Sequence, residues 1–280
     1  RFKCDWSSDV CSSDLEPRAD LWGVALVSAG VRFDHSSVYD DVFTPNIGLV
    51  VPFLAHRFRA TYSEAFRAPK PWDYTDGIGN TSLKPEKANS FEAGLTFSFW
   101  DCFRFDASGF VSHIDDAIVK EMLGDSFRWG NGGHMHTNGA ILQCNYTDGD
   151  WALGANYTYS ESYDVNNAPI PEISKHIANA SITYSFNKYI KLNIRGNYVG
   201  ERENPTLISA IGSKTIDPYL LVNGALSIVD YNGISLQFAV RNIFDVEYYH
   251  TSNRPPDRYR QPQRTFLLTA GLNLSGRKQE

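Results

Sequence analysis

Residues 91–99 read Phe-Glu-Ala-Gly-Leu-Thr-Phe-Ser-Phe, and this stretch decides the fold. Its odd positions are apolar and its even positions are polar or small, so the pattern has a period of two residues. Successive side chains of a β-strand point to opposite faces, and a period of two therefore gives one strand an apolar face and a polar face. The stretch predicts a two-faced strand, because a helix would repeat its apolar positions every three to four residues.

The same alternation recurs from residue 21 onward, for example in 151–160 and 190–199. Counting such segments predicts about twelve strands. The predicted strands cover residues 21–35, 42–53, 56–66, 88–100, 102–114, 134–147, 150–162, 176–187, 188–202, 218–230, 233–245 and 263–275. Many exceed the five to six residues usual in globular proteins, and they suit the roughly 9–11 residues with which a tilted strand crosses a bilayer.

The predicted connections alternate between tight turns and long loops. Tight turns are expected near 54–55, Asp101, Asp148-Gly149, Asn187-Lys188 and Tyr231-Asn232-Gly233, and long loops over 67–87, 115–133, 163–175, 203–217 and 246–262. Outer-membrane barrels have short periplasmic turns and long extracellular loops in this rhythm. A soluble β-sandwich has no reason to lengthen every second loop, and a propeller would repeat about every 40–50 residues. The pattern therefore predicts an all-β fold, an antiparallel transmembrane β-barrel.

Composition removes several classes of protein. The formal net charge of −6 leaves no basic surface for nucleic acid, which we exclude as a partner. No run approaches the roughly 18 apolar residues of a transmembrane helix. The four cysteines fit no zinc spacing, and we expect Cys102 and Cys144 to be free thiols of the barrel wall, with a disulfide as the alternative. We predict no metal site and no cofactor. No motif marks a Ser–His–Asp arrangement, so we predict no catalytic residue and no enzyme.

The first fifteen residues differ from the rest of the chain. Ser7-Ser8-Asp9-Val10 returns as Ser12-Ser13-Asp14-Leu15, no strand alternation runs through the segment, and it has no apolar region of a signal peptide. We interpret residues 1–15 as a non-native leader fused to a truncated gene. The predicted organisation is then 1–15 leader, 16–275 partial barrel and 276–280 C-terminal tail.

Three motifs follow one another in the middle of the chain. Residues 62–69 read Tyr-Ser-Glu-Ala-Phe-Arg-Ala-Pro, residues 80–86 read Asn-Thr-Ser-Leu-Lys-Pro-Glu, and residues 90–94 read Ser-Phe-Glu-Ala-Gly. This ordered set resembles the barrel of TonB-dependent receptors, whose strands read Y-S-x-x-F-R-A-P, then N-P-x-L-K-P-E, then S-x-E-x-G. Thr81 stands where that family has proline.

The C-terminal region carries the same resemblance. Residues 217–223, Asp-Pro-Tyr-Leu-Leu-Val-Asn, are similar to the family's Y-x-L-V-N strand. Residues 240–249, Val-Arg-Asn-Ile-Phe-Asp-Val-Glu-Tyr-Tyr, are similar to its V-x-N-L-F-D-x-x-Y strand end. Residues 262–266, Pro-Gln-Arg-Thr-Phe, are similar to its P-G-R-x-F entry to the last strand, with Gln263 in place of glycine. The resemblance covers about residues 21–275.

The resemblance implies a bacterial outer-membrane barrel of about 22 strands, of which this chain would supply about twelve at the C-terminal end. It implies an N-terminal plug and a TonB box, both expected outside this chain, that couple the receptor to the TonB–ExbB–ExbD complex. Membrane lipid and a small metal chelate would be the other partners. The implied function is energy-coupled uptake of a scarce nutrient, with a ferric siderophore as the leading expectation. A cobalamin or haem receptor and a passive porin-like barrel are the alternatives; a soluble β-sandwich binding module is a further one.

In such receptors the extracellular loops capture the substrate. Loop residues that we expect to contact it are Arg67, Trp72, Tyr74, Trp129, His134, His136, Arg254, Arg258 and Tyr259. Arginine and aromatic side chains suit an anionic, aromatic iron chelate through charge-assisted hydrogen bonds and cation–π contacts, although solvated loops at a lipid interface carry the same residues. His134 and His136 would share one face of a strand, as a haem site could require. A haem receptor of this family is expected to carry a histidine in 70–79, where this chain has none.

Overall fold

The computed structural model describes residues 2–5, 10–124, 126–204, 214–231, 233–252 and 258–273. These residues form antiparallel β-strands and one short helix, α1 (Pro71–Thr75). Within this part of the chain, no helix is both long enough and apolar enough to cross a membrane. Contacts divide the chain into two compact units, which are described separately. The first unit is Arg1–Phe97, Ala107–Ala140 and Glu161–Ile170, and the second is Ser98–Asp106, Ile141–Ser160 and Pro171–Glu280.

The first unit is a sheet of consecutive antiparallel strands. Its strands are β1 (Phe2–Asp5), β2 (Val10–Leu15), β3 (Arg18–Leu21), β4 (Ala25–Ser36), β5 (Val42–Phe53) and β6 (His56–Arg67), followed by the parts of β7 (Glu86–Phe99), β8 (Phe103–Leu123) and β9 (Ser126–Asp148) that belong to it. The order is β1-β2-β4-β5-β6-β7-β8-β9, and β3 also pairs with β4. The observed bounds of β5 and the start of β6 are those predicted from alternation.

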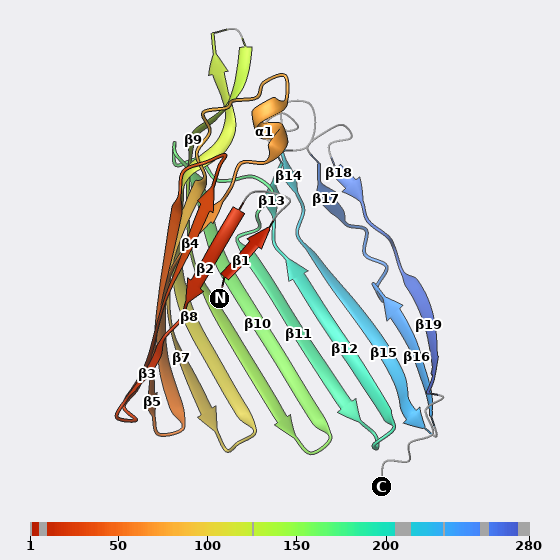
Figure 1. The fold of residues 1–280 in the computed structure, drawn as a ribbon. Helices are drawn as coiled ribbons and strands as arrows, with labels where there is room; N and C mark the ends of the chain where they lie inside the picture. The colour runs from red at the N-terminus through yellow and green to blue at the C-terminus, as the bar shows by residue number, and fades with distance from the viewer. Residues whose placement is uncertain are drawn as a thin grey trace. The chain divides into compact units, whose positions relative to one another are not determined.

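The second unit continues the same principle. Its main strands are β10 (Trp151–Asp164) up to Ser160, β11 (His176–Ser185), β12 (Ile190–Val199), β15 (Tyr219–Tyr231), β16 (Ile234–Arg241) and β19 (Thr265–Leu272), in that order across the sheet. Figure 1 shows β10, β11, β12, β15 and β16 side by side. Two short pairs lie outside this path: β13 (Arg202–Glu203) with β14 (Thr215–Ile216), and β17 (Tyr249–Thr251) with β18 (Arg258–Arg260).

The tight turns occur where the sequence predicts them. Leu54, Asp101, Gly149 and Gly233 adopt positive φ angles of 54°, 57°, 53° and 82° in the turns after β5, β7, β9 and β15. Short hairpin turns need this left-handed backbone because it matches the twist of the two strands. Glycine meets the requirement without strain, whereas Leu54 and Asp101 adopt it at a small cost.

One predicted long loop is wrong. Residues 115–133 mostly continue the strands, because β8 extends to Leu123 and β9 begins at Ser126. Apolar and polar side chains do not alternate clearly in this stretch, so its sequence carries no strand signal. Strand pairing uses backbone amides and carbonyls, which every such residue has whatever its side chain. Gly133 helps the pairing: a Cβ there would lie 2.7 Å from the Cβ of Ala117, so only glycine allows this approach. Of the other predicted loops, 67–87 holds α1, and the described parts of 203–217 and 246–262 contain strands of the short pairs.

Residues 1–15 contain strands although no alternation runs through their sequence. β1 pairs with β2, and β2 pairs with β4 from Val10↔Ser36 to Leu15↔Val31. The edge of β4 supplies free backbone groups, and any extended segment can satisfy them. The prediction that these residues are a non-native leader concerns the origin of the segment and stays a prediction. Residues 276–280, the predicted tail, lie outside the described residues.

The strands present their apolar face outward. Among the described residues, few apolar side chains are buried; they are Val42, Leu83, Ala117 and Ile216. Large apolar side chains on the strands are exposed instead, such as Phe91, Leu95 and Phe238. Several buried side chains are polar, among them Asp34, Thr96, Asp106 and Ser108. This reverses the arrangement of a soluble domain and is the arrangement of a barrel wall, with the apolar face toward lipid.

Aromatic rings gather where strands meet the tight turns of the second unit. The rings of Trp151 and Tyr184 lie 4.5 Å apart, and those of Tyr189 and Tyr231 lie 5.1 Å apart. Tyrosine and tryptophan favour the membrane–water interface because they combine an apolar body with a polar atom. These pairs are typical of one aromatic girdle of an outer-membrane barrel.

Candidate functional site

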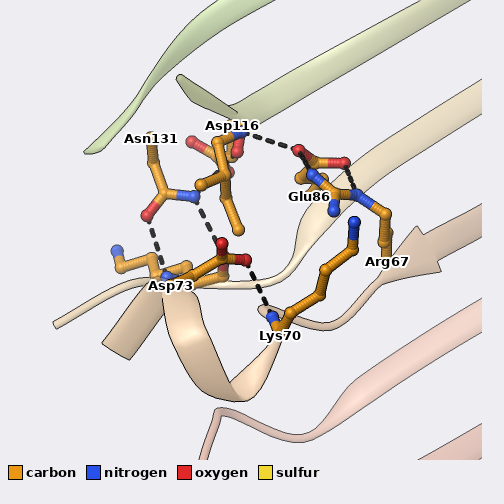
Figure 2. A network of polar contacts seen from close by, with 8 residues as sticks. Arg67, Lys70, Asp73, Glu86, Asp116 and Asn131 are labelled. Carbon is orange, nitrogen blue, oxygen red and sulfur yellow. Dashed lines mark hydrogen bonds and ion pairs between the residues drawn. The ribbon is translucent and has the colours of Figure 1, made fainter. Parts of the chain in front are cut away.

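The motif residues Arg67 and Glu86 join at the loop end of the first unit (Figure 2). The Arg67 guanidinium donates to both carboxylate oxygens of Glu86, and the Ile118 backbone N–H donates to Glu86 Oε1 at 2.7 Å. Arg67 ends the 12-residue β6 and Glu86 begins the 14-residue β7, so both lie beyond the residues needed to span a bilayer. Burial acts to raise the pKa of Glu86, but these hydrogen bonds outweigh it and hold that pKa below its ordinary value.

Helix α1 lies between Arg67 and Glu86 in the sequence. Pro71 suits its first turn because a proline there loses no helical hydrogen bond. The buried Asp73 carboxylate accepts the Lys70 backbone N–H at 2.8 Å, and the Asp73 N–H donates to the Lys70 carbonyl at 2.9 Å. Trp72 stays outside with 57% of its surface exposed, and Lys70 Nζ lies 5.1 Å from its ring centre. The helix thus presents Trp72 and a cation to solvent.

The segment between α1 and β7 is bound to β9 through backbone and amide contacts. Asn80 Nδ2 donates to the Trp129 carbonyl at 2.8 Å, and the Trp129 N–H donates to the Ile78 carbonyl at 2.9 Å. Asn131 bonds both backbone groups of Lys84, at 2.9 Å each, and also reaches the Asp116 carbonyl at 2.7 Å (Figure 2). Asn131 therefore fixes the Leu-Lys-Pro-Glu motif against the β8–β9 hairpin.

A cavity of about 640 Å³ adjoins the motif pair in the first unit. Its polar lining includes Arg32, Asp34, Tyr39, Glu64 and Arg67. Arg32 donates to both oxygens of Asp34 at 2.7 Å, and the Asp34 side chain is completely buried. The cavity offers charged and phenolic groups that could hold a polar solute, and Arg67 is the sequence-predicted residue that lines it.

His134 and His136 lie on strand β9, as the strand predicted over 134–147 requires. His134 Nδ1 lies 2.6 Å from Asp115 Oδ1, and its ring is 6.4 Å from that of His113. His136 stacks on Tyr163 with ring centres 5.2 Å apart. Within the described part of the chain, no group of three or more His, Cys, Asp or Glu side chains is arranged to hold a metal ion.

The loop end of the second unit holds an aromatic cluster of its own. The ring of Tyr219 lies 4.7 Å from that of Tyr248 and 6.5 Å from that of His250. The Arg202 guanidinium lies 5.5 Å from the Tyr219 ring centre and donates to the Tyr249 carbonyl at 2.9 Å. Burial, and secondarily the charge of Arg202, hold the pKa of His250 below its ordinary value.

The sequence-predicted ligand residues lie on several different elements of the structure. Arg67, Trp72 and Tyr74 lie close together in sequence at the end of β6 and in α1. The expectation of a loop is wrong for Trp129 on β9 and for Arg258 and Tyr259 on β18, because strand pairing extends into these loops, whereas His134 and His136 lie in the strand predicted over 134–147. Arg258 lies 4.3 Å from the Tyr249 ring centre, and Tyr259 is exposed. Arg254 lies outside the described residues. The backbone of Trp129 bonds the segment between α1 and β7 through Ile78 and Asn80.

Sequence reasoning missed the residues that organise these sites. Glu86 and Asn131 fix the first unit's loop end, and Arg202 and Tyr219 organise the second unit's cluster. Glu86 could have been found, because it ends the Leu-Lys-Pro-Glu motif and Arg67 is the nearest motif cation. Asn131 and Arg202 carry no motif signal, because their partners are distant in sequence. Cys102 and Cys144 are free thiols, as predicted.

Comparison with known proteins agrees with this geometry. The family model described as "TonB dependent receptor-like, beta-barrel" matches residues 19–243. The vitamin B12 transporter BtuB of Vibrio vulnificus strain YJ016 is 26% identical over 231 residues, which cover 80% of this chain and 36% of that protein. The BtuB of Vibrio cholerae serotype O1 strain M66-2 is 23% identical over 261 residues, covering 90% and 41%. The chain therefore spans about two fifths of the length of these relatives.

Solved structures share the fold at low identity. The siderophore receptor PirA of Acinetobacter baumannii superposes with a TM-score of 0.82 and 18% identity, covering 94% of this chain and 45% of that one. A mutant ferric enterobactin receptor PfeA of Pseudomonas aeruginosa, in complex with enterobactin, gives a TM-score of 0.78 and 15% identity, covering 94% and 45%. Strand pattern, turn rhythm, motif order and family match agree, and the chain belongs to the β-barrel family of TonB-dependent receptors of the bacterial outer membrane.

Proposed function

We propose that this chain is part of a TonB-coupled receptor that takes up a scarce metal chelate across the outer membrane. The family match over residues 19–243 is the observation that carries the proposal. A passive porin-like barrel would not need the ordered motifs, in which Arg67, Lys84 and Glu86 build a fixed loop end. The proposal includes no catalytic step.

A ferric siderophore is the leading ligand. The exposed Trp72 with Lys70 beside it, and the Arg258–Tyr249 stack, combine cations with aromatic faces. An iron chelate with catecholate or carboxylate groups carries negative charge and planar rings, which bind to such surfaces through cation–π and charge-assisted contacts. Haem is less supported, because residues 70–79 contain no histidine.

Cobalamin is the second candidate, and one observation favours it. Two of the relatives with detectable sequence identity are vitamin B12 transporters, at 23% and 26%. Cobalamin is a larger and less anionic chelate than a catecholate siderophore. It would therefore depend less on the arginines and more on the aromatic and amide groups of the loop ends.

The partners follow from the same proposal. The exposed apolar face of the strands would contact membrane lipid, which covers the apolar outer surface of outer-membrane barrels. Energy would come from the TonB–ExbB–ExbD complex through an N-terminal region with a plug and a TonB box. The described residues contribute the wall and the loop ends.

The test is uptake by cells that depend on this receptor. We expect a strain carrying the gene to accumulate a radiolabelled ferric siderophore or radiolabelled cyanocobalamin, and a deletion strain to lose that uptake. A protonophore should abolish the uptake within minutes while surface binding persists. Uptake that survives the protonophore would contradict TonB coupling and favour the passive barrel. Which label accumulates decides between the two ligands.

A matched pair of variants places the ligand on the loop ends. Trp72→Ala should lower binding of the accepted ligand about tenfold, because it removes a large exposed aromatic contact. Trp100→Ala is the control, since Trp100 is also exposed but lies in the tight turn between β7 and β8. Equal binding by both variants and the parent would remove Trp72 from the site.

A further inference from the structure

The polar face of the second unit carries a chain of hydrogen-bonded asparagines. Asn179 Nδ2 donates to Asn156 Oδ1 at 2.9 Å, and Asn197 Nδ2 donates to Asn179 Oδ1 at 2.6 Å. Asn223 Nδ2 donates to Asn197 Oδ1 at 3.3 Å, and the Asn242 backbone N–H donates to Asn223 Oδ1 at 2.9 Å. We call these five residues the asparagine ladder. It crosses β10, β11, β12 and β15 and ends just after β16.

Two arginines flank the ladder on either side of Asn223. Arg195 on β12 pairs directly with Asn223 on β15. Arg241 on β16 follows Val240, which pairs with Gly224, so Arg241 faces Asn223 from the other side. Neighbouring strands lie about 4.8 Å apart, which places the two arginine Cα atoms about 10 Å from each other. Side chains of that length can converge on one group between them.

A cavity of about 500 Å³ lies at this point. Its polar lining consists of Arg195 and Arg241 with the amides of Asn193, Asn197, Asn223 and Gln237. The side chains at the base of the cavity are small, because Ala225 on β15 pairs directly with Ala239 on β16. Small residues leave room between the two guanidinium groups, and the amides add neutral hydrogen-bond donors.

Within the described part of the chain, the two arginines have no carboxylate partner. Among the residues that the structure describes, neither Arg195 nor Arg241 forms an ion pair, and no Asp or Glu lines the cavity. Lys191, on the same face of β12, adds a further positive charge. Both arginines are exposed. Positive charge without a counter-charge in a concave site raises the local concentration of anions.

We propose that this cavity is an anion-binding site on the inner wall, for a solute that carries carboxylate groups. Each guanidinium can hold one carboxylate with two parallel hydrogen bonds, and the ladder amides can donate to the remaining oxygens. The proposal rests on the proposed uptake function for its setting, a polar wall that faces a solute path. Its test measures thiol chemistry and not uptake, so the two can fail separately.

The test uses a cysteine as a reporter inside the cavity. The four native cysteines are replaced by serine, and Ala225→Cys is introduced, because Ala225 makes no side-chain hydrogen bond and lies between Asn193 and Ala239. The protein is studied in outer-membrane vesicles. Rates are measured with an anionic sulfonate-bearing methanethiosulfonate and a cationic trimethylammonium analogue, each divided by the rate with a free thiol.

We expect the anionic reagent to react about tenfold faster than the cationic one at Ala225→Cys. Replacing both arginines, Arg195→Gln with Arg241→Gln, should remove that preference. Lys188→Gln is the control for loss of a positive charge elsewhere, because Lys188 lies in the tight turn and outside the cavity. Citrate should slow the reaction of the anionic reagent with the Ala225→Cys protein that keeps both arginines, whereas sorbitol should not. A glutamate-rich hexapeptide in place of citrate shows whether the carboxylates can also come from an acidic peptide.

Three results would overturn the proposal. Equal normalised rates for the two reagents would show that the cavity does not select anions. A preference that survives the double arginine replacement would assign the selection to other groups. A cysteine that reacts with neither reagent would show that the cavity is closed to solutes.

Discussion

Strands β4–β7 of the first unit and strands β10–β16 of the second unit differ in how the charged side chains of their polar faces are paired. In the first unit, arginines are paired with carboxylates: Arg32 with Asp34, Arg59 with Glu92 at 3.1 Å, and Arg67 with Glu86. On strands β10–β16 of the second unit, asparagines bond one another, and Arg195 and Arg241 form no ion pair with any residue that the structure describes. The first arrangement satisfies its charges internally. The second leaves positive charge available to a solute.

Ion pairs and neutral amide hydrogen bonds are also two different ways of stabilising neighbouring strands. An ion pair is strong when one partner is buried, but it depends on the protonation of the carboxylate. A neutral amide bond contributes less and does not titrate. The carboxylate pairs of the first unit should therefore respond to acid and to loss of single carboxylates, and the bonded asparagines of β10–β16 should respond to neither.

The largest expected effect is the loss of Glu86. Glu86→Ala leaves the Arg67 guanidinium and the Ile118 N–H without their acceptor, and the Glu86 side chain is only 13% exposed. Breaking a buried pair costs about 3–5 kcal/mol, but the half-exposed Arg67 can turn to water, so we expect a loss of about 2 kcal/mol. Denaturant unfolding of the detergent-purified protein measures it. A loss of unfolding free energy smaller than that caused by Asn197→Ala would show that the ion pair stabilises the protein less than the asparagine bonds do.

Acid should weaken the same network. The folded-state pKa of Glu86 is lowered, so its contribution to stability is complete above the ordinary carboxyl pKa and is lost as the pH falls through the folded value. We expect limited proteolysis of the segment from α1 to β7 to rise as the pH drops below about 4. Glu86→Gln should remove this pH dependence. An unchanged acid response in that variant would assign the effect to another carboxylate.

The asparagine ladder should give a smaller and pH-independent effect. Asn197→Ala removes one bond to Asn179 and one from Asn223, for a loss of about 1 kcal/mol. Asn156→Ala, at the end of the ladder, removes only one bond and should cost about half as much. A double-mutant cycle with Asn179→Ala measures the coupling. Zero coupling between positions 179 and 197 would show that the ladder is not a unit.

The smallest effect is expected at an exposed ion pair. Arg260 and Glu247 lie 3.2 Å apart, and both side chains are about half exposed. Exposed pairs contribute little because water screens them, so Glu247→Gln should change stability by less than about 0.5 kcal/mol. The same unfolding titration serves as the baseline for the Glu86 and Asn197 variants. A loss as large as that of Glu86→Ala would mean that charge pairing alone does not distinguish the two units.

The sequence predicted most of the wall and little of the sites. Alternation placed β5 at 42–53, and it placed β10 and β15 within two residues at each end, because each strand buries one face and exposes the other. It failed at 115–133, where backbone pairing extends β8 and β9 without alternation. Of the predicted ligand residues, Arg67 lines a cavity, whereas Trp129 joins two segments by its backbone.

The sequence by itself determined the class of protein: two-faced strands, tight turns in alternation with long connections, and ordered family motifs. These features are local, so they can be read along one chain. Only the tertiary structure decided which side chains meet. Alternation assigns Asn156, Asn179, Asn197 and Asn223 to the polar face but does not say that they are neighbours. Their contact depends on strand register, which is fixed by pairing between segments that the pattern treats separately.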